Sequence, residues 1–331
     1  MTALPTRILG STSLRLTEIG FGAASLGNLY RETTDDDASD AVAQAWESGI
    51  RYFDTAPHYG LGLSERRLGR ALAAYPRHEY VVSTKVGRLL EPSPHPTARD
   101  TEGFDVPGDV RRVWDFSRDG VRRSLDDSLR RLGMDHVDIV YAHDPDQFRE
   151  GAARQGLDAL AELRSQGVVQ AIGVGTNAVG ELTDLLRDGL IDVAMLAGRY
   201  TLLEQGGLRS VLQPALEAQA SVVAVGVFNT GLLSTAWPAT NAKYDYDDAP
   251  PDLVTRARQL AIICERHATT LPQAAIAFPL LHPAVSSVAI GMRNAEQVES
   301  NIARYKEGVP NELWADLIDS RLIDPAAIPL A

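Results

Sequence analysis

The sequence predicts an α/β protein folded as a (β/α)8 (TIM) barrel, with a single domain over residues 1–331. Three observations favour this fold. Strand-like and helix-like segments alternate eight times, the strand-like runs are apolar throughout, and no linker divides the chain. Apolar strands that are each followed by a helix are typical of a parallel sheet covered by helices. Eight such units in about 300 residues suit a closed barrel, with an open doubly wound sheet as the alternative.

The predicted strands are eight short apolar runs, most of which stop at a glycine or a polar residue. They cover residues 16–21, 50–53, 80–85, 137–142, 168–174, 191–196, 221–225 and 286–290. Apolar runs of this length that are bounded by turn residues are typical of buried strands.

The predicted helices carry apolar residues at helical spacing. In residues 35–48, for example, one face holds Ala38, Val42, Ala45 and Trp46. Ser64 is a good N-cap for the second helix, and Gly133 suits the C-cap of the third. The predicted ranges are 35–48, 64–74, 117–132, 156–166, 179–188, 208–219, 251–267, 271–281 and 294–305, the last being the final full helix.

One long segment interrupts the alternation after the third strand. Residues 88–116 are rich in proline, aspartate and arginine. Loops of this length are uncommon inside compact domains and are usually functional or disordered. We therefore interpret the segment as a long loop at the mouth of the barrel.

The composition limits the kinds of partner and the cellular compartment that we expect. The formal net charge of −12 argues against nucleic acid or an anionic membrane as a partner. The single cysteine, Cys264, excludes a disulfide within the chain and fits a reducing cytoplasm. The N-terminus lacks an apolar signal core, and no run approaches the ~20 apolar residues of a membrane span. We expect a cytoplasmic protein that acts on a small molecule; the oligomeric state stays open.

Ionisable side chains stand at the ends of three consecutive predicted strands. Asp54 ends the second, Lys85 the third and His143 the fourth, while Tyr59 lies on the loop after Asp54. Because active sites of (β/α)8 barrels lie at the C-terminal ends of the strands, these four groups are predicted to converge. Each has another interpretation by itself: a helix N-cap for Asp54, a rim aromatic for Tyr59, an unrelated ion pair for Lys85 and a buried imidazole for His143.

The four groups together suit proton transfer to or from a carbonyl compound. A free tyrosine has a pKa of about 10, and a nearby ammonium lowers that pKa by favouring the phenolate. A carboxylate paired with the lysine keeps the lysine charged and fixes its position. A neutral histidine can donate a hydrogen bond to the substrate oxygen. The hydride of such a reaction must come from a cofactor.

These residues lie in stretches that resemble the aldo-keto reductase superfamily. The stretches are residues 49–60 (GIRYFDTAPHYG), 81–85, 132–143 and 168–175, within a resemblance that runs from Arg7 to about Tyr305. The resemblance implies that Asp54, Tyr59, Lys85 and His143 form the catalytic tetrad, with Tyr59 and His143 also touching the substrate. It further implies a nicotinamide cofactor bound extended across the barrel mouth without a Rossmann domain. No Gly-x-Gly-x-x-Gly motif follows a strand here.

The resemblance also implies cofactor contacts, with departures from the family pattern. Thr176 and Asn177 stand where many members have Ser-Asn for the nicotinamide amide, and Met195 stands where glutamine is usual. Phe228 lies near the place of the aromatic residue that stacks on nicotinamide, with rim packing as the alternative. The full implied set is Gly22, Ala23, Asp54, Thr176, Asn177, Phe228, Asn229, Gly231, Leu232, Gly291, Arg293, Gln297 and Asn301.

The sequence favours NAD, with NADP as the alternative. Members of the family that prefer NADP often carry cations at the positions of Gly291 and Gln297, and a 2′-phosphate needs such partners. Arg293 is the one remaining candidate for a phosphate clamp, and it is equally interpretable as a solvated charge at a helix start.

The long segment from residues 87–90 through 114–120, then residues 123–125, together with 143–146 and 202–205, is similar to the galactose/fucose dehydrogenase branch of the superfamily. That branch includes L-galactose, L-fucose and D-threo-aldose 1-dehydrogenases and the related pyridoxal 4-dehydrogenase. The resemblance implies oxidation of a sugar hemiacetal to its lactone, or turnover of pyridoxal or another aldehyde or ketone. Trp114 is a candidate wall of the substrate pocket, with loop packing as the alternative.

Two alternatives come from other functional classes. A barrel that binds nicotinamide can act as a redox sensor without physiological turnover, as channel-associated members of the superfamily do. A metal-dependent hydrolase would use His58, His143 and Asp54, but the sequence shows no pair of ligands at the usual spacing. No metal site is predicted.

Overall fold

The computed structural model describes residues 4–245 and 247–328, and its centre is a closed barrel of eight parallel strands. The strands follow one another around the barrel in chain order, and the last pairs with the first, Gly291 lying opposite Gly22. They are β3 (Ile19–Gly22), β4 (Tyr52–Asp54), β5 (Val81–Val86), β8 (Ile139–His143), β9 (Ala171–Thr176), β10 (Val193–Ala197), β11 (Ser221–Val225) and β14 (Val285–Gly291). The predicted (β/α)8 barrel is confirmed, and the open sheet is wrong.

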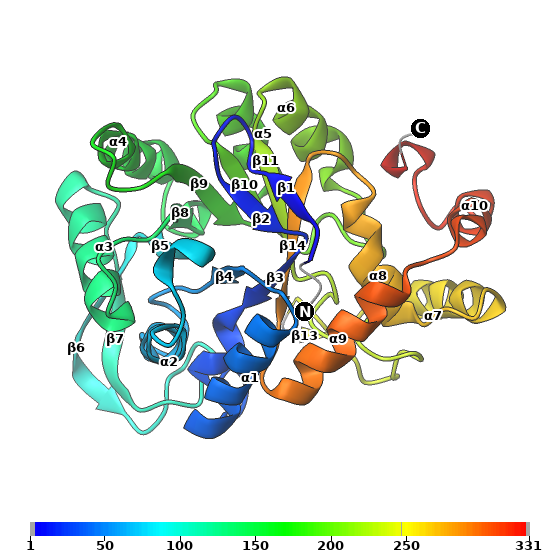
Figure 1. Ribbon diagram of the computed structural model, residues 1–331, viewed down its shortest axis with the longest axis horizontal. Coiled ribbons are helices and arrows are strands. Elements are labelled where there is room, and N and C mark those ends of the chain that lie inside the picture. The colour runs from blue at the N-terminus through cyan, green and yellow to red at the C-terminus, as the bar shows by residue number, and fades with distance from the viewer. Residues whose placement is uncertain (1–3, 246, 329–331) are drawn as a thin grey trace.

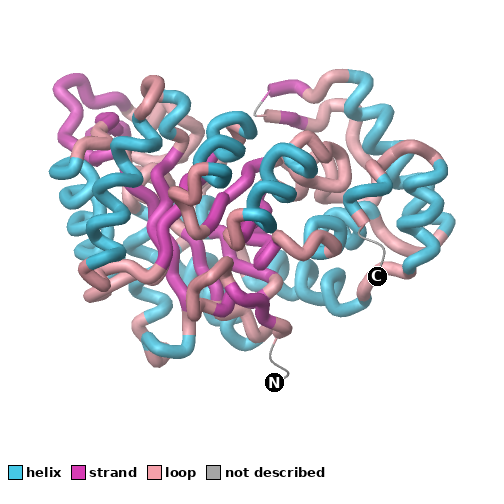
Figure 2. The backbone as a smooth tube through the Cα atoms, turned by 90° about the horizontal axis from the view of Figure 1, so that it is seen from above, coloured by secondary structure: helices cyan, strands magenta, loops and turns pink. Residues whose placement is uncertain are grey.

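Helices encircle the strands (Figure 1), which gather at the centre of the molecule in the view from above (Figure 2). The helices are α1 (Asp35–Glu47), α2 (Leu63–Leu72), α3 (Arg118–Leu132), α4 (Ala152–Ser165), α5 (Val179–Arg187), α6 (Gln213–Glu217), α7 (Pro251–Arg266), α8 (Leu271–Leu280), α9 (Ala295–Glu307) and α10 (Asn311–Asp319). The expectation that the helix ending near Tyr305 is the last full helix was wrong, because α10 follows it and buries Leu313, Trp314 and Leu317. Within residues 4–245 and 247–328, no helix is long and apolar enough to cross a membrane.

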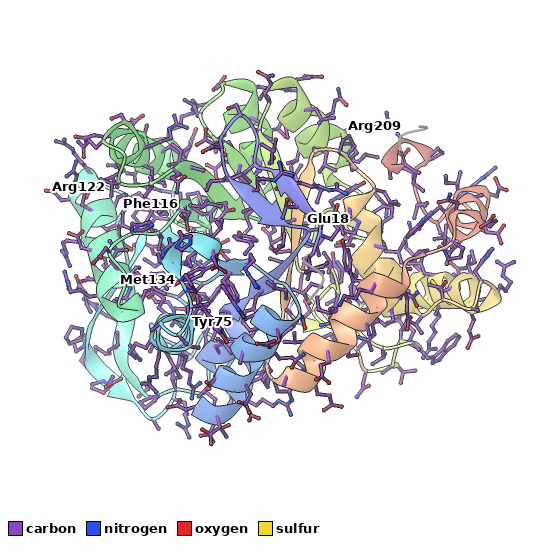
Figure 3. All side chains as sticks on the ribbon, viewed as in Figure 1. Glu18, Tyr75, Phe116, Arg122, Met134 and Arg209 are labelled. Carbon is purple, nitrogen blue, oxygen red and sulfur yellow. The ribbon has the colours of Figure 1, made fainter. Side chains whose placement is uncertain are left out.

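The first predicted strand, 16–21, is divided in two. Its first part belongs to β2 (Arg15–Thr17), which pairs antiparallel with β1 (Thr6–Ile8), whereas its second part is β3 of the barrel. The division falls at Glu18, labelled near this hairpin in Figure 3, whose carboxylate accepts hydrogen bonds from Arg7 and from the Tyr305 hydroxyl. The fully buried Leu16 contributes to the apolar cluster inside the barrel, so the hairpin closes the end opposite the strand C-termini.

The predicted long loop 88–116 is instead a β-hairpin in its greater part. β6 (Arg88–Thr97) pairs antiparallel with β7 (Gly108–Trp114). The prolines Pro92, Pro94 and Pro96 occupy every second position of β6. Proline is tolerated on an edge strand when its missing N–H would face solvent, so prolines on one side of the ladder leave the hairpin intact. The segment does stand at the mouth of the barrel, because Arg88 and Glu102 line the cavity described below.

Two other predicted elements differ from the structure. The strand predicted at 168–174 begins only at Ala171, because Gly167 has a positive φ of 73° and Val168 is 39% exposed in the turn. The helix predicted at 208–219 begins as a wide π-turn, Leu208–Leu212, before α6. Pro214 has no N–H for a regular helical bond, which is consistent with the wider turn.

A further two-stranded sheet, β12 (Lys243–Tyr244) with β13 (Asp247–Asp248), lies between β11 and α7 in the chain.

Candidate active site

A cavity of about 620 Å³ opens at the C-terminal ends of the barrel strands. Strand ends supply one part of its lining, including Asp54, Lys85, His143 and Thr176. The β6–β7 hairpin and the loops after β3, β4 and β11 supply the rest. The predicted position of the site at this rim of the barrel matches the position of the cavity.

The four predicted catalytic side chains meet in this cavity. The Lys85 ammonium donates to Asp54 Oδ2 at 2.7 Å and to the Thr55 carbonyl at 2.9 Å. Its Nζ lies 4.7 Å from the centroid of the Tyr59 ring, and the Tyr59 and His143 ring centroids are 5.9 Å apart. Asp54 does not cap a helix, since the N-cap of α2 is Gly62. The convergence expected from the strand ends is therefore present, and the roles of the four groups are taken up below as proposals.

A buried hydrogen-bond network beneath the cavity fixes Asp54. The Ser83 hydroxyl donates to Asp54 Oδ1 at 2.7 Å, so both carboxylate oxygens have a partner. Ser83 in turn lies 3.0 Å from the Tyr52 hydroxyl, which lies 3.3 Å from that of Tyr141. Ser83 was not singled out from the sequence. Its position two residues before Lys85, on the same face of a strand, is the signal that could have found it.

The loop that carries Tyr59 is held by a close backbone contact. Gly60 has a φ of +62°, and a Cβ at this position would lie 2.2 Å from the Gly27 carbonyl oxygen. Only glycine combines this backbone conformation with this approach. Gly60 therefore allows the loop that carries Tyr59 to pack directly against the backbone of the turn after β3.

The expected low pKa of Tyr59 is wrong. Burial raises the pKa of Tyr59 to about 12, although the Lys85 ammonium acts to lower it. Burial is the strongest single influence on Lys85 and acts to lower its pKa, but the Asp54 carboxylate and the Tyr59 hydroxyl together outweigh burial and the pKa is raised overall. At neutral pH the site therefore holds a phenol next to an ammonium.

His143 is a neutral imidazole, as expected. Burial lowers its pKa well below the usual value, and the positive charges of Arg88 and Lys85 lower it further. His143 is 7% exposed, and its Nδ1 is buried without a hydrogen-bond partner among the described residues. Its Nε2 lies 3.6 Å from Asp144 Oδ2.

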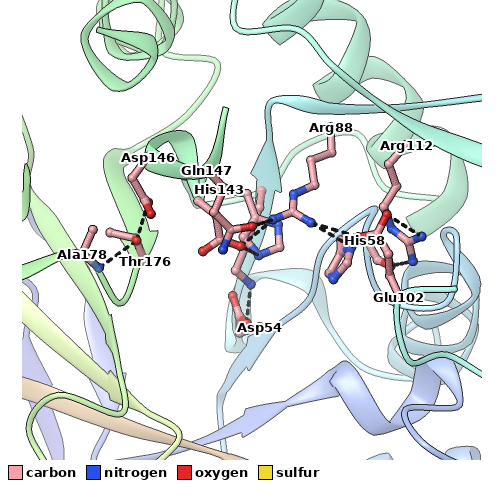
Figure 4. Close-up of polar contacts among 12 residues, drawn as sticks. Asp54, His58, Arg88, Glu102, Arg112, His143, Asp146, Gln147, Thr176 and Ala178 are labelled. Atoms are coloured by element: carbon pink, nitrogen blue, oxygen red, sulfur yellow. Dashed lines mark hydrogen bonds and ion pairs between the residues drawn. The ribbon is translucent and has the colours of Figure 1, made fainter. Parts of the chain in front are cut away.

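Arg88, Glu102, Asp144 and Gln147 were not singled out as site residues from the sequence, and His58 was considered there only as a metal ligand. The largely buried Arg88 donates to Asp144 Oδ2 at 2.6 Å and to Gln147 Oε1 at 3.2 Å, and it contacts His58 Nδ1 at 3.2 Å (Figure 4). Glu102 lies 3.6 Å from the same guanidinium. Asp144 directly follows His143 in the chain, which is the signal that could have found it, and His58 directly precedes Tyr59, which places it in this cavity and not in a metal site.

Trp114 does not line the cavity. Its ring stacks on Phe116 and Phe148 at centroid distances of 5.9 and 5.8 Å, and the Arg88 guanidinium carbon lies 4.3 Å from the ring centroid. The structure thus favours loop packing for Trp114, which supports Arg88 from behind.

The predicted cofactor residues divide into two groups. Those that line the cavity are Gly22, Asp54, Thr176, Phe228, Gly231 and Gly291. Those outside its lining are Ala23, Asn177, Asn229, Leu232, Arg293, Gln297 and Asn301. The Thr176 hydroxyl donates to Asp146 at 2.6 Å and accepts from the Ala178 N–H (Figure 4), while Asn177 is exposed.

Arg293 already donates hydrogen bonds from its guanidinium to acceptors within the protein. Its guanidinium donates to the Leu29 carbonyl at 2.6 Å, to the Arg31 carbonyl at 2.9 Å and to the Thr33 hydroxyl. Its backbone N–H donates to Gln297 Oε1 at 2.9 Å. Arg293 therefore fastens the loop after β3 to the start of α9, and neither the solvated charge nor a free clamp describes it.

The residues of the cavity fit a flat nicotinamide ring. Glycines line it at several places, and a Cβ at Gly175 would lie 3.6 Å from Met195 and 3.8 Å from Lys85 Cε. The absence of that side chain leaves room beside Lys85 and Met195. Among residues 4–245 and 247–328, no group of three or more His, Cys, Asp or Glu side chains is arranged to hold a metal ion.

Comparison with known proteins extends over nearly the whole chain. Residues 18–319 match the model of the aldo/keto reductase family. The chain is 44% identical to a D-threo-aldose 1-dehydrogenase of a Pseudomonas species over 317 residues, covering 95% of this chain and 96% of the relative. It is 39% identical to a pyridoxal 4-dehydrogenase of Microbacterium luteolum over 336 residues, covering 96% and 97%.

The fold agrees with these matches. An aldo-keto reductase from Bacillus halodurans, solved in its holo form, superposes with a TM-score of 0.74 at 25% identity and covers 98% of both chains. Enzymes of this family use nicotinamide cofactors, for which the cavity has the room described above. The chain belongs to the aldo/keto reductase family of oxidoreductases.

Proposed function

We propose that this protein is an aldose 1-dehydrogenase that oxidises the cyclic hemiacetal of a neutral sugar to its lactone. The observation that carries the proposal is the Asp54–Lys85–Tyr59 arrangement beside the neutral His143, at one edge of a glycine-lined cavity. The relative named D-threo-aldose 1-dehydrogenase, 44% identical over nearly its full length, supports this class of substrate.

Each residue of the tetrad has a role in this reaction. Tyr59, as phenolate, accepts the proton of the hemiacetal hydroxyl, and Lys85 stabilises the charge on its oxygen. His143 is neutral and donates an N–H to the substrate oxygen, which fixes the carbon in place. Asp54 holds Lys85 charged and oriented through the 2.7 Å hydrogen bond. A bound nicotinamide would take up the hydride from the same carbon. In the reverse direction the Tyr59 phenol is the acid.

We propose NAD as the preferred cofactor. A 2′-phosphate needs cationic partners such as a free arginine fork. Arg293, the cation expected to serve, donates instead to three acceptors in the loop after β3. Gln297 is uncharged and accepts from the Arg293 backbone, and Gly291 offers no side chain.

An absorbance assay at the NADH band tests the function and the cofactor together. The purified protein is offered L-fucose, L-galactose, D-galactose, D-arabinose and pyridoxal, with NAD and NADP in parallel. We expect aldose-dependent reduction of NAD that exceeds that of NADP. Turnover of pyridoxal alone would favour the activity of the second relative, and nucleotide binding without turnover of any compound would favour a redox sensor. Preference for NADP would contradict the cofactor proposal.

The two directions of the reaction should respond differently to pH. With a pKa of about 12, Tyr59 is protonated at neutral pH, so the acid for reduction is present while the base for oxidation is scarce. Between roughly pH 7 and pH 10, kcat/KM for aldose oxidation should therefore rise, whereas kcat/KM for aldehyde reduction should stay constant. Initial rates in both directions over this range test the expectation. A flat oxidation profile would show that another group is the base.

A further inference from the structure

Arg88 organises one wall of the cavity. It is 5% exposed and reaches three acceptors from two segments: His58 on the loop after β4, and Asp144 and Gln147 on the turn after β8. The Trp114 ring lies against its guanidinium. The imidazole, the carboxylate and the amide all line the cavity and are all oriented by this one cation. Figure 4 shows His58 and Gln147 on either side of Arg88.

The chemistry of arginine fixes how these groups are turned. A guanidinium has five N–H donors and no acceptor, so every group bonded to it must present a lone pair. His58 therefore accepts at Nδ1 and carries its proton on Nε2. Gln147 turns its carbonyl oxygen toward Arg88 and leaves its amide N–H groups for another partner. Burial, together with the charges of Arg88 and Arg112, lowers the pKa of His58 to about 2, so the ring stays neutral.

The His58 donor stands close to the reacting groups. Its ring centroid lies 5.5 Å from that of His143 and 5.9 Å from that of Tyr59. A substrate oxygen held between Tyr59 and His143 would place the neighbouring carbons of a sugar within reach of His58. Neither His58 Nε2 nor the Gln147 amide nitrogen has a protein acceptor among the described residues.

The charges of the cavity disfavour an anionic substrate. Among the described residues that line it, the cations are Lys85 and Arg88, and each is paired with a carboxylate, Asp54 or Asp144. Arg112, which donates to the His58 carbonyl from behind, binds Asp100 through two hydrogen bonds of 2.7 and 3.0 Å. Among the described residues of the lining, no cation is left unpaired for a phosphate, and Glu102 adds a further negative charge.

We infer that His58 and Gln147, oriented by Arg88, donate hydrogen bonds to hydroxyl groups on the carbons next to the reacting one. The inference rests on the proposed function and deepens it. It makes these residues specificity determinants that select neutral, hydroxyl-bearing substrates over phosphorylated or hydroxyl-free ones. Arg88 is a positioning residue, since both of its terminal nitrogens donate to protein acceptors.

The test compares two aldehydes that differ in hydroxyl groups. Reduction of glyceraldehyde and of propanal with NADH is measured for the wild type, for His58→Phe and for Gln147→Met. A site built to donate to a hydroxyl loses at least about tenfold in kcat/KM when that bond is removed. We expect each variant to lose about tenfold or more with glyceraldehyde and less than about twofold with propanal. Glyceraldehyde 3-phosphate should be a poorer substrate than glyceraldehyde.

Matched variants distinguish a loss of hydroxyl recognition from a loss of activity caused by a disturbed structure. His78→Phe makes the same change at an exposed site before β5, at the opposite end of the barrel, and should alter neither rate. Arg88→Lys should reproduce the glyceraldehyde-specific loss, because an ammonium cannot hold three acceptors in the plane of a fork. Equal losses with both aldehydes, or an unchanged rate with glyceraldehyde, would overturn the inference.

The same measurements distinguish this inference from the proposed function. A wild type that oxidises no aldose would remove the proposed function. The rates of reduction of glyceraldehyde and propanal would still show whether His58 and Gln147 donate hydrogen bonds to substrate hydroxyl groups. A wild type that prefers the phosphorylated aldehyde would overturn the selection for neutral substrates.

Discussion

Replacement of Tyr59 by phenylalanine should lower kcat by at least about 100-fold while the protein keeps its affinity for the nicotinamide nucleotide. General acid–base help is typically worth this factor, and the variant loses only the phenolic oxygen. The ring remains to pack against Phe104 and His143, whose centroids lie 6.1 and 5.9 Å away. The cavity should therefore keep its shape.

Two measurements check this expectation: steady-state turnover in both directions, and titration of the protein with NADH followed by fluorescence. Tyr75→Phe is the matched control, because Tyr75 stacks on Trp46 at 4.0 Å, outside the lining of the cavity (Figure 3). It should leave both quantities unchanged. If Tyr59→Phe turns over at the rate of the wild type, Tyr59 is not the proton donor or acceptor.

Replacement of Lys85 by methionine should abolish turnover and also destabilise the fold by about 3–5 kcal/mol. Lys85 and Asp54 are 1% and 4% exposed, and Lys85 donates to the Asp54 carboxylate at 2.7 Å. Without the ammonium, Asp54 is left as a buried charge whose remaining partner is the Ser83 hydroxyl. Removing one member of a buried pair is costly for this reason.

A second substitution separates the two effects. In Asp54→Asn/Lys85→Met neither position carries a charge, and the amide oxygen can still accept from Ser83. Much of the lost stability should therefore return while turnover stays absent. Denaturant unfolding followed by circular dichroism measures the stability. Lys243→Met, which breaks the exposed pair with Asp248, should leave the free energy of unfolding essentially unchanged. A Lys85→Met variant as stable as the wild type would contradict the account of this pair.

The sequence predicted the barrel and the meeting of the tetrad because both follow from local pattern. Apolar runs followed by amphipathic helices dictate parallel strands, and parallel strands present their C-terminal ends on one rim. Asp54, Lys85 and His143 each stand at such an end, so their convergence needed only the correct strand assignment. The position of Tyr59 beside these groups follows because it lies on the short loop directly after Asp54, at the same rim of the barrel.

The sequence could not predict the β6–β7 hairpin as a strand pair, since its alternating prolines resemble a loop until the partner strand is known. The division of the first strand at Glu18 likewise depends on Arg7 and Tyr305, which lie 11 and 287 residues away along the chain.

By itself, the sequence determined the closed barrel, the rim that carries the site, and the family. Only the tertiary structure decided that Arg88 orients His58 and Gln147, that Arg293 is held by the loop after β3, and that burial raises the pKa of Tyr59. The physical reason is that periodicity is a property of neighbouring residues. Burial and hydrogen-bond partners are set instead by segments that meet only after the chain has folded.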